Sequence, residues 1–190
     1  MYKNFVNEYE GFVKKLNLTL KNYVNMSDFP SLYKPIQYIL SSEGKRLRPF
    51  LFYLSSKVYN VPNDKIFQLG LSVEMLHCFS LVHDDIMDED DLRRGKETIH
   101  KKWDLSTAML VGDAIFALVY KNINELNNTK KVLHAFTKET INLCEGQSLD
   151  KIFESKNSIS IDDYLNMIEL KTGSLLSLSC KLGGILGDIT

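Results

Sequence analysis

Two aspartates at helical spacing are the residues of this sequence best suited to chemistry. Asp84 and Asp88 lie in the stretch HDDIMDEDDLRRG, which follows an apolar run. Residues four apart share one face of a helix, with Cβ atoms roughly 5–6 Å from each other. Two carboxylates that close repel unless a cation lies between them, and they suit Mg²⁺, which takes oxygen ligands at about 2.0–2.1 Å. We therefore predict that Asp84 and Asp88 bind Mg²⁺.

The alternative is a solvated acidic surface, which is common at helix ends and which residues 89–91 fit well. Asp84, however, directly follows the apolar residues 78–82. A carboxylate on an otherwise buried helix is costly unless it is paired or bound to a metal, which favours the metal site for Asp84 and Asp88. Asp85 lies about 100° round the helix from Asp84, so we expect it to support the site or to ligate only in part.

Two arginines, Arg93 and Arg94, follow the acidic stretch at once. Arginine makes bidentate contacts to phosphate. Mg²⁺ that is held by few carboxylates usually has phosphate among its other ligands. The predicted ligand of this region is therefore a metal-bound polyphosphate.

A second group of cations, Lys45, Arg46 and Arg48, lies in the stretch SSEGKRLRP. Pro49 suits the first turn of a helix, and backbone N–H groups at a helix N-terminus attract anions. A solvated basic loop explains these residues equally well when they are taken alone.

His77 lies on the same helical stripe as Asp84 and Asp88. A lone histidine on an apolar helix is usually a core residue. Because this one shares its stripe with the two aspartates, we predict that it contacts a ligand.

Helical patterning runs through the chain, and no stretch predicts a convincing strand. An amphipathic stripe runs from Phe5 to Leu16, and further helices are expected over 32–40, 50–59, 66–88, 106–126, 130–153, 162–170 and 174–186. Breaks are expected at 25–30, with Ser27 or Asp28 as helix caps, and at 127–129. Residues 93–103 are expected to be a polar connection.

Two positions inside these helices need an explanation. Asp113 lies among apolar residues, so it needs a partner such as a cation or a helix cap. Lys171-Thr172-Gly173 interrupts a helical pattern, which would expose backbone carbonyls beside a cation. Taken alone, a simple kink is the preferred explanation of this interruption.

The composition is that of a globular chain with one helical domain over residues 1–190. Hydrophobic residues make up 44% of the 190 residues and charged residues 25%, which is enough for a sizeable core. The net charge of −1 gives no electrostatic basis for binding nucleic acid or an anionic membrane. No apolar run is expected to span a bilayer, and the N-terminus lacks the apolar core of a signal peptide.

The three cysteines, Cys78, Cys144 and Cys180, show no zinc or redox spacing. All three lie in apolar contexts, so we expect buried free thiols. This expectation fits a reducing cytoplasm.

Taken together, the motifs resemble those of trans-isoprenyl diphosphate synthases of the farnesyl and geranylgeranyl type. In chain order, the residues that carry the resemblance are Gly44-Lys45-Arg46-Leu47-Arg48-Pro49, His77, Asp84-Asp85-Ile86-Met87-Asp88, Arg93-Arg94-Gly95, Gly112-Asp113, Gly146-Gln147 with Asp150, and Lys171-Thr172-Gly173. The match runs through most of the chain, and the combination of motifs is highly specific.

The resemblance implies an all-α fold, an isoprenoid synthase-like bundle of antiparallel helices around a central cavity, without the family's C-terminal helices. It also implies a homodimeric, Mg²⁺-dependent prenyltransferase of isoprenoid biosynthesis. The substrates would be isopentenyl diphosphate and an allylic diphosphate.

The resemblance also implies roles for individual residues. Asp84 and Asp88 would bind the Mg²⁺ that bridges the allylic diphosphate, and Arg93 would contact that diphosphate. The residues that would hold isopentenyl diphosphate are Lys45, Arg48, His77 and Arg94. The residues near the allylic leaving group and the reacting end would be Lys171, Thr172 and Gln147.

The chemistry of such a site follows from the charge on its substrates. Diphosphate leaves only if metal ions and cations neutralise its growing negative charge. The allylic cation left behind requires an apolar, closed cavity. The double bond of isopentenyl diphosphate would attack this cation, and the departing diphosphate is a candidate acceptor for the proton that is lost.

One feature departs from the family pattern. Members carry a second aspartate-rich motif in a later helix, and this sequence ends at Gly187-Asp188-Ile189-Thr190 before any such motif. A truncated chain, a fragmentary gene product and a subunit completed by another chain are all compatible with this. The alternatives to an active synthase are a noncatalytic binding subunit and, more remotely, a terpene cyclase, although a cyclase needs no second diphosphate site.

Product length is predicted from the residues that precede the aspartates. Ser80 and Phe79 lie about one turn before Asp84, given a rise near 1.5 Å per residue. In the family, bulk at these two positions acts as the cavity floor, and one aromatic residue five before the motif resembles the archaeal geranylgeranyl type. We therefore predict geranylgeranyl diphosphate as the main product, with farnesyl diphosphate as the alternative, and core packing as the structural alternative for Phe79.

Overall fold

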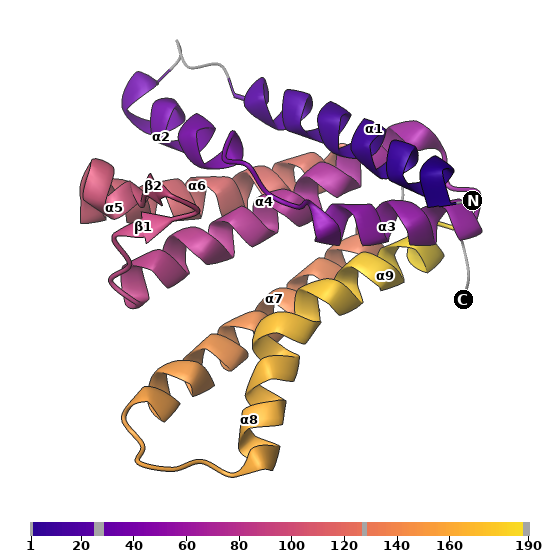
Figure 1. The fold of residues 1–190 in the computed structure, drawn as a ribbon. Helices are drawn as coiled ribbons and strands as arrows, with labels where there is room; N and C mark the ends of the chain where they lie inside the picture. Colours follow the sequence, from indigo (N-terminus) through magenta and orange to yellow (C-terminus); the bar gives the residue numbers. More distant parts are fainter. Residues whose placement is uncertain (1, 25–28, 127–128, 188–190) are drawn as a thin grey trace. The chain divides into compact units, whose positions relative to one another are not determined.

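The computed structural model describes residues 2–24, 29–126 and 129–187 (Figure 1). Contacts between residues divide the chain into two compact units. The first unit takes residues 1–50 and 67–125, and the second unit takes residues 51–66 and 126–190.

Helices account for most of the described residues, as the sequence predicts. In chain order, the elements are α1 (Tyr2–Lys21), α2 (Pro30–Leu40), α3 (Leu47–Val58), α4 (Asn63–Met87), β1 (Leu92–Arg93), β2 (Lys96–Glu97), α5 (Ile99–Lys102), α6 (Leu105–Asn124), α7 (Thr129–Glu154), α8 (Ile161–Ile168), the π-helical turn η1 (Glu169–Gly173) and α9 (Ser174–Leu186). The predicted caps at Ser27 or Asp28 and the predicted turn at Asn127-Asn128 lie outside the described residues.

In the first unit, α4 provides the central apolar face. Leu69, Val73 and Leu76 are fully buried on this helix. A polar clasp joins α4 to α6, since Asn122 Nδ2 donates to Gln68 O at 2.6 Å and Gln68 Nε2 donates to Asn122 O at 3.0 Å. The clasp satisfies buried polar groups that would otherwise be costly, so it fixes the register of the two helices.

Helix α4 is long and apolar enough to cross a membrane by length and composition, which the sequence analysis did not expect. Its most apolar window is 61% buried in the structure. Burial of this kind is ordinary for the core helix of a globular protein, so the window is weak support for a membrane span.

A short hairpin replaces the predicted polar connection at the start of residues 93–103. Strands β1 and β2 are antiparallel, with Leu92 opposite Glu97 and Arg93 opposite Lys96. The two turn residues, Arg94 and Gly95, have φ values of 54° and 75°, as a two-residue type I′ hairpin requires. Strands of two residues are too short to show alternation in the sequence, so the prediction of no strand was wrong here.

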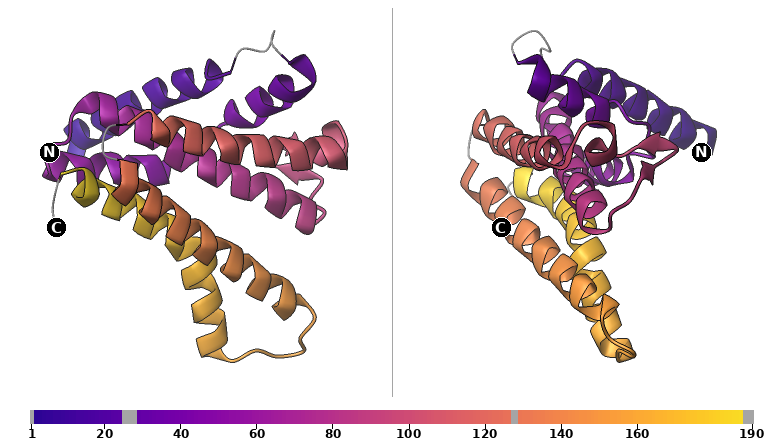
Figure 2. Two further views of the ribbon diagram at one scale, coloured as in Figure 1. Left: turned by 180° about the vertical axis from the view of Figure 1, so that it is seen from behind. Right: turned by 90° about the vertical axis from the view of Figure 1, so that its left-hand side faces the viewer.

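In the second unit, α7 packs against η1 and α9, and the views in Figure 2 show α7 and α9 side by side. Gly146 lets the backbones approach, because a Cβ at this position would lie 2.2 Å from Lys171 N. Gly183 does the same against α3, where a Cβ would lie 2.4 Å from Ser55 Oγ. Ser160 caps α8 by accepting a hydrogen bond from Asp163 N at 3.0 Å.

The cysteine prediction holds for only one of the three thiols. Cys78 is buried, and burial raises its pKa to about 12. Cys144 and Cys180 are exposed on α7 and α9. Their apolar sequence neighbours are buried on the other faces of these helices, which is why local composition predicted the wrong environment.

Candidate functional site

The predicted metal ligands lie at the C-terminal end of α4, in the first unit. Asp84 is half-buried and Asp88 is exposed. The helical hydrogen bond continues to Asp88, whose N–H donates to Asp84 O at 2.8 Å, so the two residues are one turn apart. Carboxylates at the negative end of a helix dipole are unfavourable, and a bound cation would relieve that cost.

Asp85 faces a different way and anchors the hairpin. Arg93 Nε donates to Asp85 Oδ1, and Arg93 Nη2 donates to Asp90 Oδ2 at 3.0 Å. Burial raises the pKa of Asp85, while the hydrogen bond and the charge of Arg93 oppose that rise. Asp85 therefore holds an arginine close to the predicted metal ligands. A guanidinium carries five N–H donors, so these two bonds leave donor capacity on Arg93 for the predicted diphosphate.

The donor set fits Mg²⁺ together with a phosphate ligand. Among the described residues, no group of three or more His, Cys, Asp or Glu side chains surrounds one point. Mg²⁺ is commonly held by one or two carboxylates, with waters and substrate phosphates completing its shell. Asp84 and Asp88 match that pattern, and they would not suit a closed site made of protein ligands alone.

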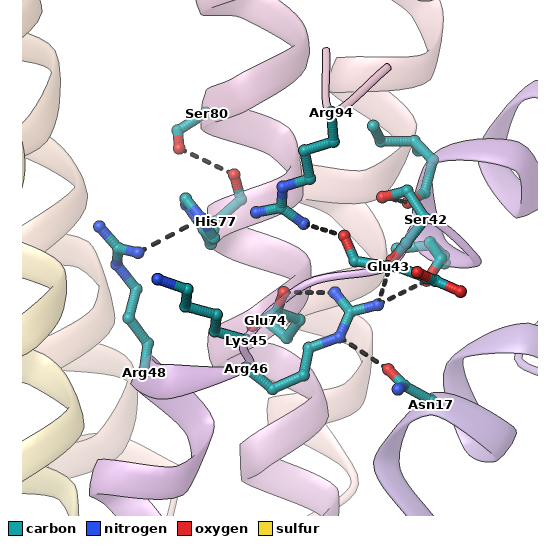
Figure 3. Close-up of polar contacts among 12 residues, drawn as sticks. Asn17, Ser42, Glu43, Lys45, Arg46, Arg48, Glu74, His77, Ser80 and Arg94 are labelled. Atoms are coloured by element: carbon teal, nitrogen blue, oxygen red, sulfur yellow. Dashed lines mark hydrogen bonds and ion pairs between the residues drawn. The ribbon is translucent and has the colours of Figure 1, made fainter. Parts of the chain in front are cut away.

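A second site lies in the first unit, in a cavity of about 620 Å³ that we call the cationic cavity. It is lined by Glu43, Gly44, Lys45, Arg46, Leu47, Arg48, Glu74, His77 and Arg94. Figure 3 shows that the labelled members come from the loop before α3, from the first turn of α3, from α4 and from the β1–β2 hairpin. The four residues predicted to hold isopentenyl diphosphate are all among them.

His77 is a neutral member of the cationic cavity. Burial, together with the positive charges of Arg48 and Arg94, lowers its pKa to about 3. Arg48 Nη1 lies 3.3 Å from His77 Nε2. Because a guanidinium can only donate, Nε2 must accept and the proton must sit on Nδ1. Within the described part of the chain, His77 Nδ1 and Arg48 Nε are buried without a hydrogen-bond partner, so both are available to an anionic ligand.

Arg94 reaches the cavity from the hairpin. Its Nη1 donates to Glu43 O at 2.5 Å. Gly44 makes room for it, because a Cβ at residue 44 would lie 2.3 Å from that nitrogen. Lys45 is exposed, and its carbonyl accepts a 2.5 Å hydrogen bond from the hydroxyl of Tyr9.

Arg46 is the functional candidate that the sequence analysis missed, because it was grouped with the other loop cations. Its side chain extends away from His77 toward Asn17 (Figure 3). There it forms a buried ion pair with Glu74 at 2.5 Å. The two residues are 28 positions apart in the chain, so no local pattern could have connected them.

In the second unit, the predicted residues gather around η1. Lys171 Nζ lies 2.5 Å from Asp150 Oδ2, and Thr172 is exposed. Gln147 is buried, and neither polar atom of its amide has a partner among the residues described. The predicted interruption at Lys171-Thr172-Gly173 is a π-helical turn that continues α8 into α9. The helix is therefore not broken there, which agrees with the simple kink preferred from the sequence. Such turns are frequent at functional sites.

Phe79, predicted to limit chain length, lies against α6. Its ring stacks on Phe116 with a centroid distance of 4.9 Å. The side chain of Asp113 is 71% exposed and lies 3.8 Å from His83 Nε2, so the expectation of an apolar setting was wrong. Ser80 Oγ donates to His77 O at 2.8 Å.

Comparison with known proteins places this arrangement in a family. The family model for polyprenyl synthetase matches residues 29–190. The geranylgeranyl diphosphate synthase of Sulfolobus acidocaldarius is 35% identical over 96% of this chain and 57% of its own length. The short chain isoprenyl diphosphate synthase of Methanocaldococcus jannaschii is 34% identical over 94% of this chain and 55% of its own length.

Solved structures agree with the sequence relatives. The geranylgeranyl pyrophosphate synthetase from Pyrococcus horikoshii matches with a TM-score of 0.91 and 33% identity, covering 100% of this chain and 59% of that one. The all-α, isoprenoid synthase-like fold predicted from the sequence is therefore confirmed. The chain spans little more than half the length of the curated relatives named above. From its motifs, its fold and these matches, the chain belongs to the polyprenyl synthetase family of isoprenyl diphosphate synthases.

Proposed function

We propose that this chain serves a short-chain trans-prenyltransferase that condenses isopentenyl diphosphate with an allylic diphosphate to give geranylgeranyl diphosphate. The observation that carries the proposal is the presence of two different anion sites in the first unit. The cationic cavity needs no metal to attract phosphate, whereas Asp84 and Asp88 attract phosphate only through a cation. Two sites of different chemistry suit two diphosphate substrates.

Isopentenyl diphosphate is assigned to the cationic cavity. Lys45, Arg48 and Arg94 supply the positive charge, and His77 supplies a neutral donor from Nδ1. Charge-assisted hydrogen bonds of this kind are roughly twice as strong as neutral ones. The site thus holds the diphosphate end and leaves the isopentenyl chain to react.

The allylic diphosphate is assigned to Asp84, Asp88 and Arg93. Bound Mg²⁺ would supply neutralisation of the leaving group. The family resemblance assigns Lys171 of the second unit, which pairs with Asp150, to the allylic leaving group. The exposed hydroxyl of Thr172 and the unpartnered amide of Gln147 are the remaining polar groups assigned to the reacting end.

The relatives' printed names support the product assignment, since three of those matched at 31–36% identity are geranylgeranyl diphosphate synthases. We extend the proposal to a homodimer in the cytoplasm, with no nucleic acid partner and no stable membrane insertion. The burial of α4 supports the last point.

Titration with isopentenyl diphosphate, with and without chelator, tests the two-site assignment. We expect chelator to leave isopentenyl diphosphate binding intact and to abolish binding of geranyl diphosphate. Lys45→Ala should weaken only the first ligand and Asp88→Ala only the second. Equal loss of both ligands on chelation would contradict the proposal.

A second candidate function is a binding subunit of a prenyl synthase complex that does not turn over by itself. It is considered because the chain covers 55–57% of the two relatives described above, so the activity of a whole relative does not transfer automatically. Incorporation of labelled isopentenyl diphosphate by the isolated chain would exclude it. Binding without incorporation would favour it.

A further inference from the structure

The ion pair of Arg46 and Glu74 forms part of the lining of the cationic cavity, and the proposed function leaves it without a role. The side chains are 1% and 3% exposed. Desolvating two charges is expensive, and hydrophobic replacements of buried ion pairs are often as stable or more stable. Stability alone therefore does not explain why two charges are buried at this place.

Arg46 binds several elements at once. Nη1 donates to Glu74 on α4, Nη2 donates to Ser42 O at 2.5 Å in the loop after α2, and Nε donates to Asn17 Oδ1 at 2.8 Å on α1. Only the planar fork of a guanidinium presents donors in these directions together. Arg46 thus fixes the basic loop against α1 and α4.

The backbone at Arg46 determines where its neighbours point. Its φ is 48°, in the left-handed region that residues other than glycine seldom adopt. This conformation sends Arg46 toward Asn17, while Lys45 and Arg48 extend on the side of His77 (Figure 3). Such outliers persist only where surrounding contacts over-determine them, and the bonds of Arg46 are those contacts.

The Arg46–Glu74 ion pair, which we call the clamp, is connected through Glu74 to the ligand-binding side of α4. Residues three apart share a helix face, so Glu74 lies one turn before His77. Because Arg46 and Glu74 neutralise each other, the clamp sets the loop position without adding net charge to the cavity.

We propose that Arg46 is a positioning residue, which acts through Glu74 to hold Lys45 and Arg48 at the correct distance from His77 for a diphosphate. The inference rests on the proposed function of the cationic cavity. Arg46 itself does not contact the ligand. Its loss therefore loosens the arrangement of the three residues that do.

The test is calorimetric titration of the chain with isopentenyl diphosphate in the presence of chelator, with thermal unfolding of each variant measured in parallel. Arg46→Lys keeps the charge but loses the fork, and Glu74→Gln keeps the shape but loses the charge. We expect each to raise the Kd about 10-fold or more, the scale on which loss of supporting residues weakens a site. Asn17→Ala removes only the acceptor of Arg46 Nε, so we expect its Kd for isopentenyl diphosphate to rise about 3-fold. Because it leaves both charges in place, it still tests the proposal if a charge variant fails to fold.

Asn122→Ala is the matched control for general destabilisation of the first unit. It breaks the buried clasp between Asn122 and Gln68, away from the cavity, and should leave the Kd within about 2-fold of the original protein. Mg²⁺-dependent binding of geranyl diphosphate should stay unchanged in every variant. If a variant were partly unfolded, its binding of geranyl diphosphate would fall as well.

The inference is overturned if Arg46→Lys and Asn17→Ala bind isopentenyl diphosphate as the original protein does. It is also overturned if Asn122→Ala loses as much thermal stability as these two variants and its Kd rises by the same factor as theirs. Lys45→Ala separates this failure from failure of the proposed function. If Lys45→Ala weakens binding and Arg46→Lys does not, only the positioning role falls. If the original protein does not bind the ligand, both fall.

Discussion

Gly44 lies directly against the guanidinium of Arg94, so that a Cβ at residue 44 would be 2.3 Å from Arg94 Nη1. The same nitrogen donates to the carbonyl of Glu43. The missing side chain therefore lets an arginine from the hairpin close over the basic loop.

Gly44→Ala should displace Arg94 and raise the metal-free Kd for isopentenyl diphosphate about 10-fold, since loss of one charge-assisted contact is worth about 1.5–3 kcal/mol. The melting temperature should change little, because the clashing atoms are the far end of a flexible side chain. Gly11→Ala is the control, since nothing lies within 4 Å of a Cβ at that helical position. It should keep the Kd and stabilise the chain by up to about 1 kcal/mol. A large drop in melting temperature with an unchanged Kd would contradict the assignment.

Asp88→Ala should abolish Mg²⁺-dependent binding of the allylic diphosphate, because one of the two carboxylates of the donor set is lost. In a form of the enzyme that turns over, the rate should fall about 10²–10³-fold, the scale of removing an electrostatic stabiliser. Titration calorimetry and labelled-substrate incorporation measure the two effects. Metal-free binding of isopentenyl diphosphate serves as the internal control and should be retained. Unchanged turnover in Asp88→Ala would contradict the assignment of Asp88 as a metal ligand.

His77 should make the chain sensitive to acid over a defined range. Its folded pKa of about 3 lies below the usual value of 6.5, so the unfolded chain binds the extra proton first. The stabilising contribution is therefore complete above pH 6.5 and is lost as the pH falls toward 3, by up to about 1.4 kcal/mol per pH unit.

His77→Gln should flatten the decline in unfolding free energy between pH 6.5 and 4.5, as measured by urea titration. The internal control is the range from pH 7 to 8, where the difference between the two proteins should be constant. A decline of the same steepness in His77→Gln would show that other groups control the acid sensitivity.

Phe79→Ala should lengthen the products of an active form, if this ring closes the end of the chain-binding cavity. Product analysis by chromatography of the released prenyl alcohols measures the effect. The stacking of Phe79 on Phe116 means that some stability is lost in either case. The loss should be below the roughly 3–5 kcal/mol of a fully buried ring, because Phe79 is only half-buried. Products of unchanged length from a destabilised variant would assign Phe79 to core packing.

The helices could be predicted from the sequence because the apolar stripes that they bury recur with helical spacing. Most of the residues that line the cationic cavity could be predicted because they belong to the motifs. Helix α4 begins at Asn63 rather than Ile66, and α3 begins at Leu47 rather than Phe50. These errors lie at helix ends, where periodicity carries the least information.

Pairings between distant residues could not be read from local patterns. Arg46 and Glu74 meet only because the loop folds back onto α4, and Asp113 points outward because α6 presents only its other face to the core. Gly146 of α7 likewise approaches the backbone of the π-helical turn at Lys171 closely, which no spacing in the sequence reveals.

The type I′ turn of the hairpin sends the side chains of two consecutive arginines to different parts of the first unit. Arg93 joins Asp85 and Asp90, whereas Arg94 joins the loop at Glu43. The left-handed turn at Arg94 and Gly95 therefore directs the two arginines to two different proposed ligands. Inserting a single residue into this turn would misdirect both arginines together, so both proposed diphosphate sites depend on the same short piece of backbone.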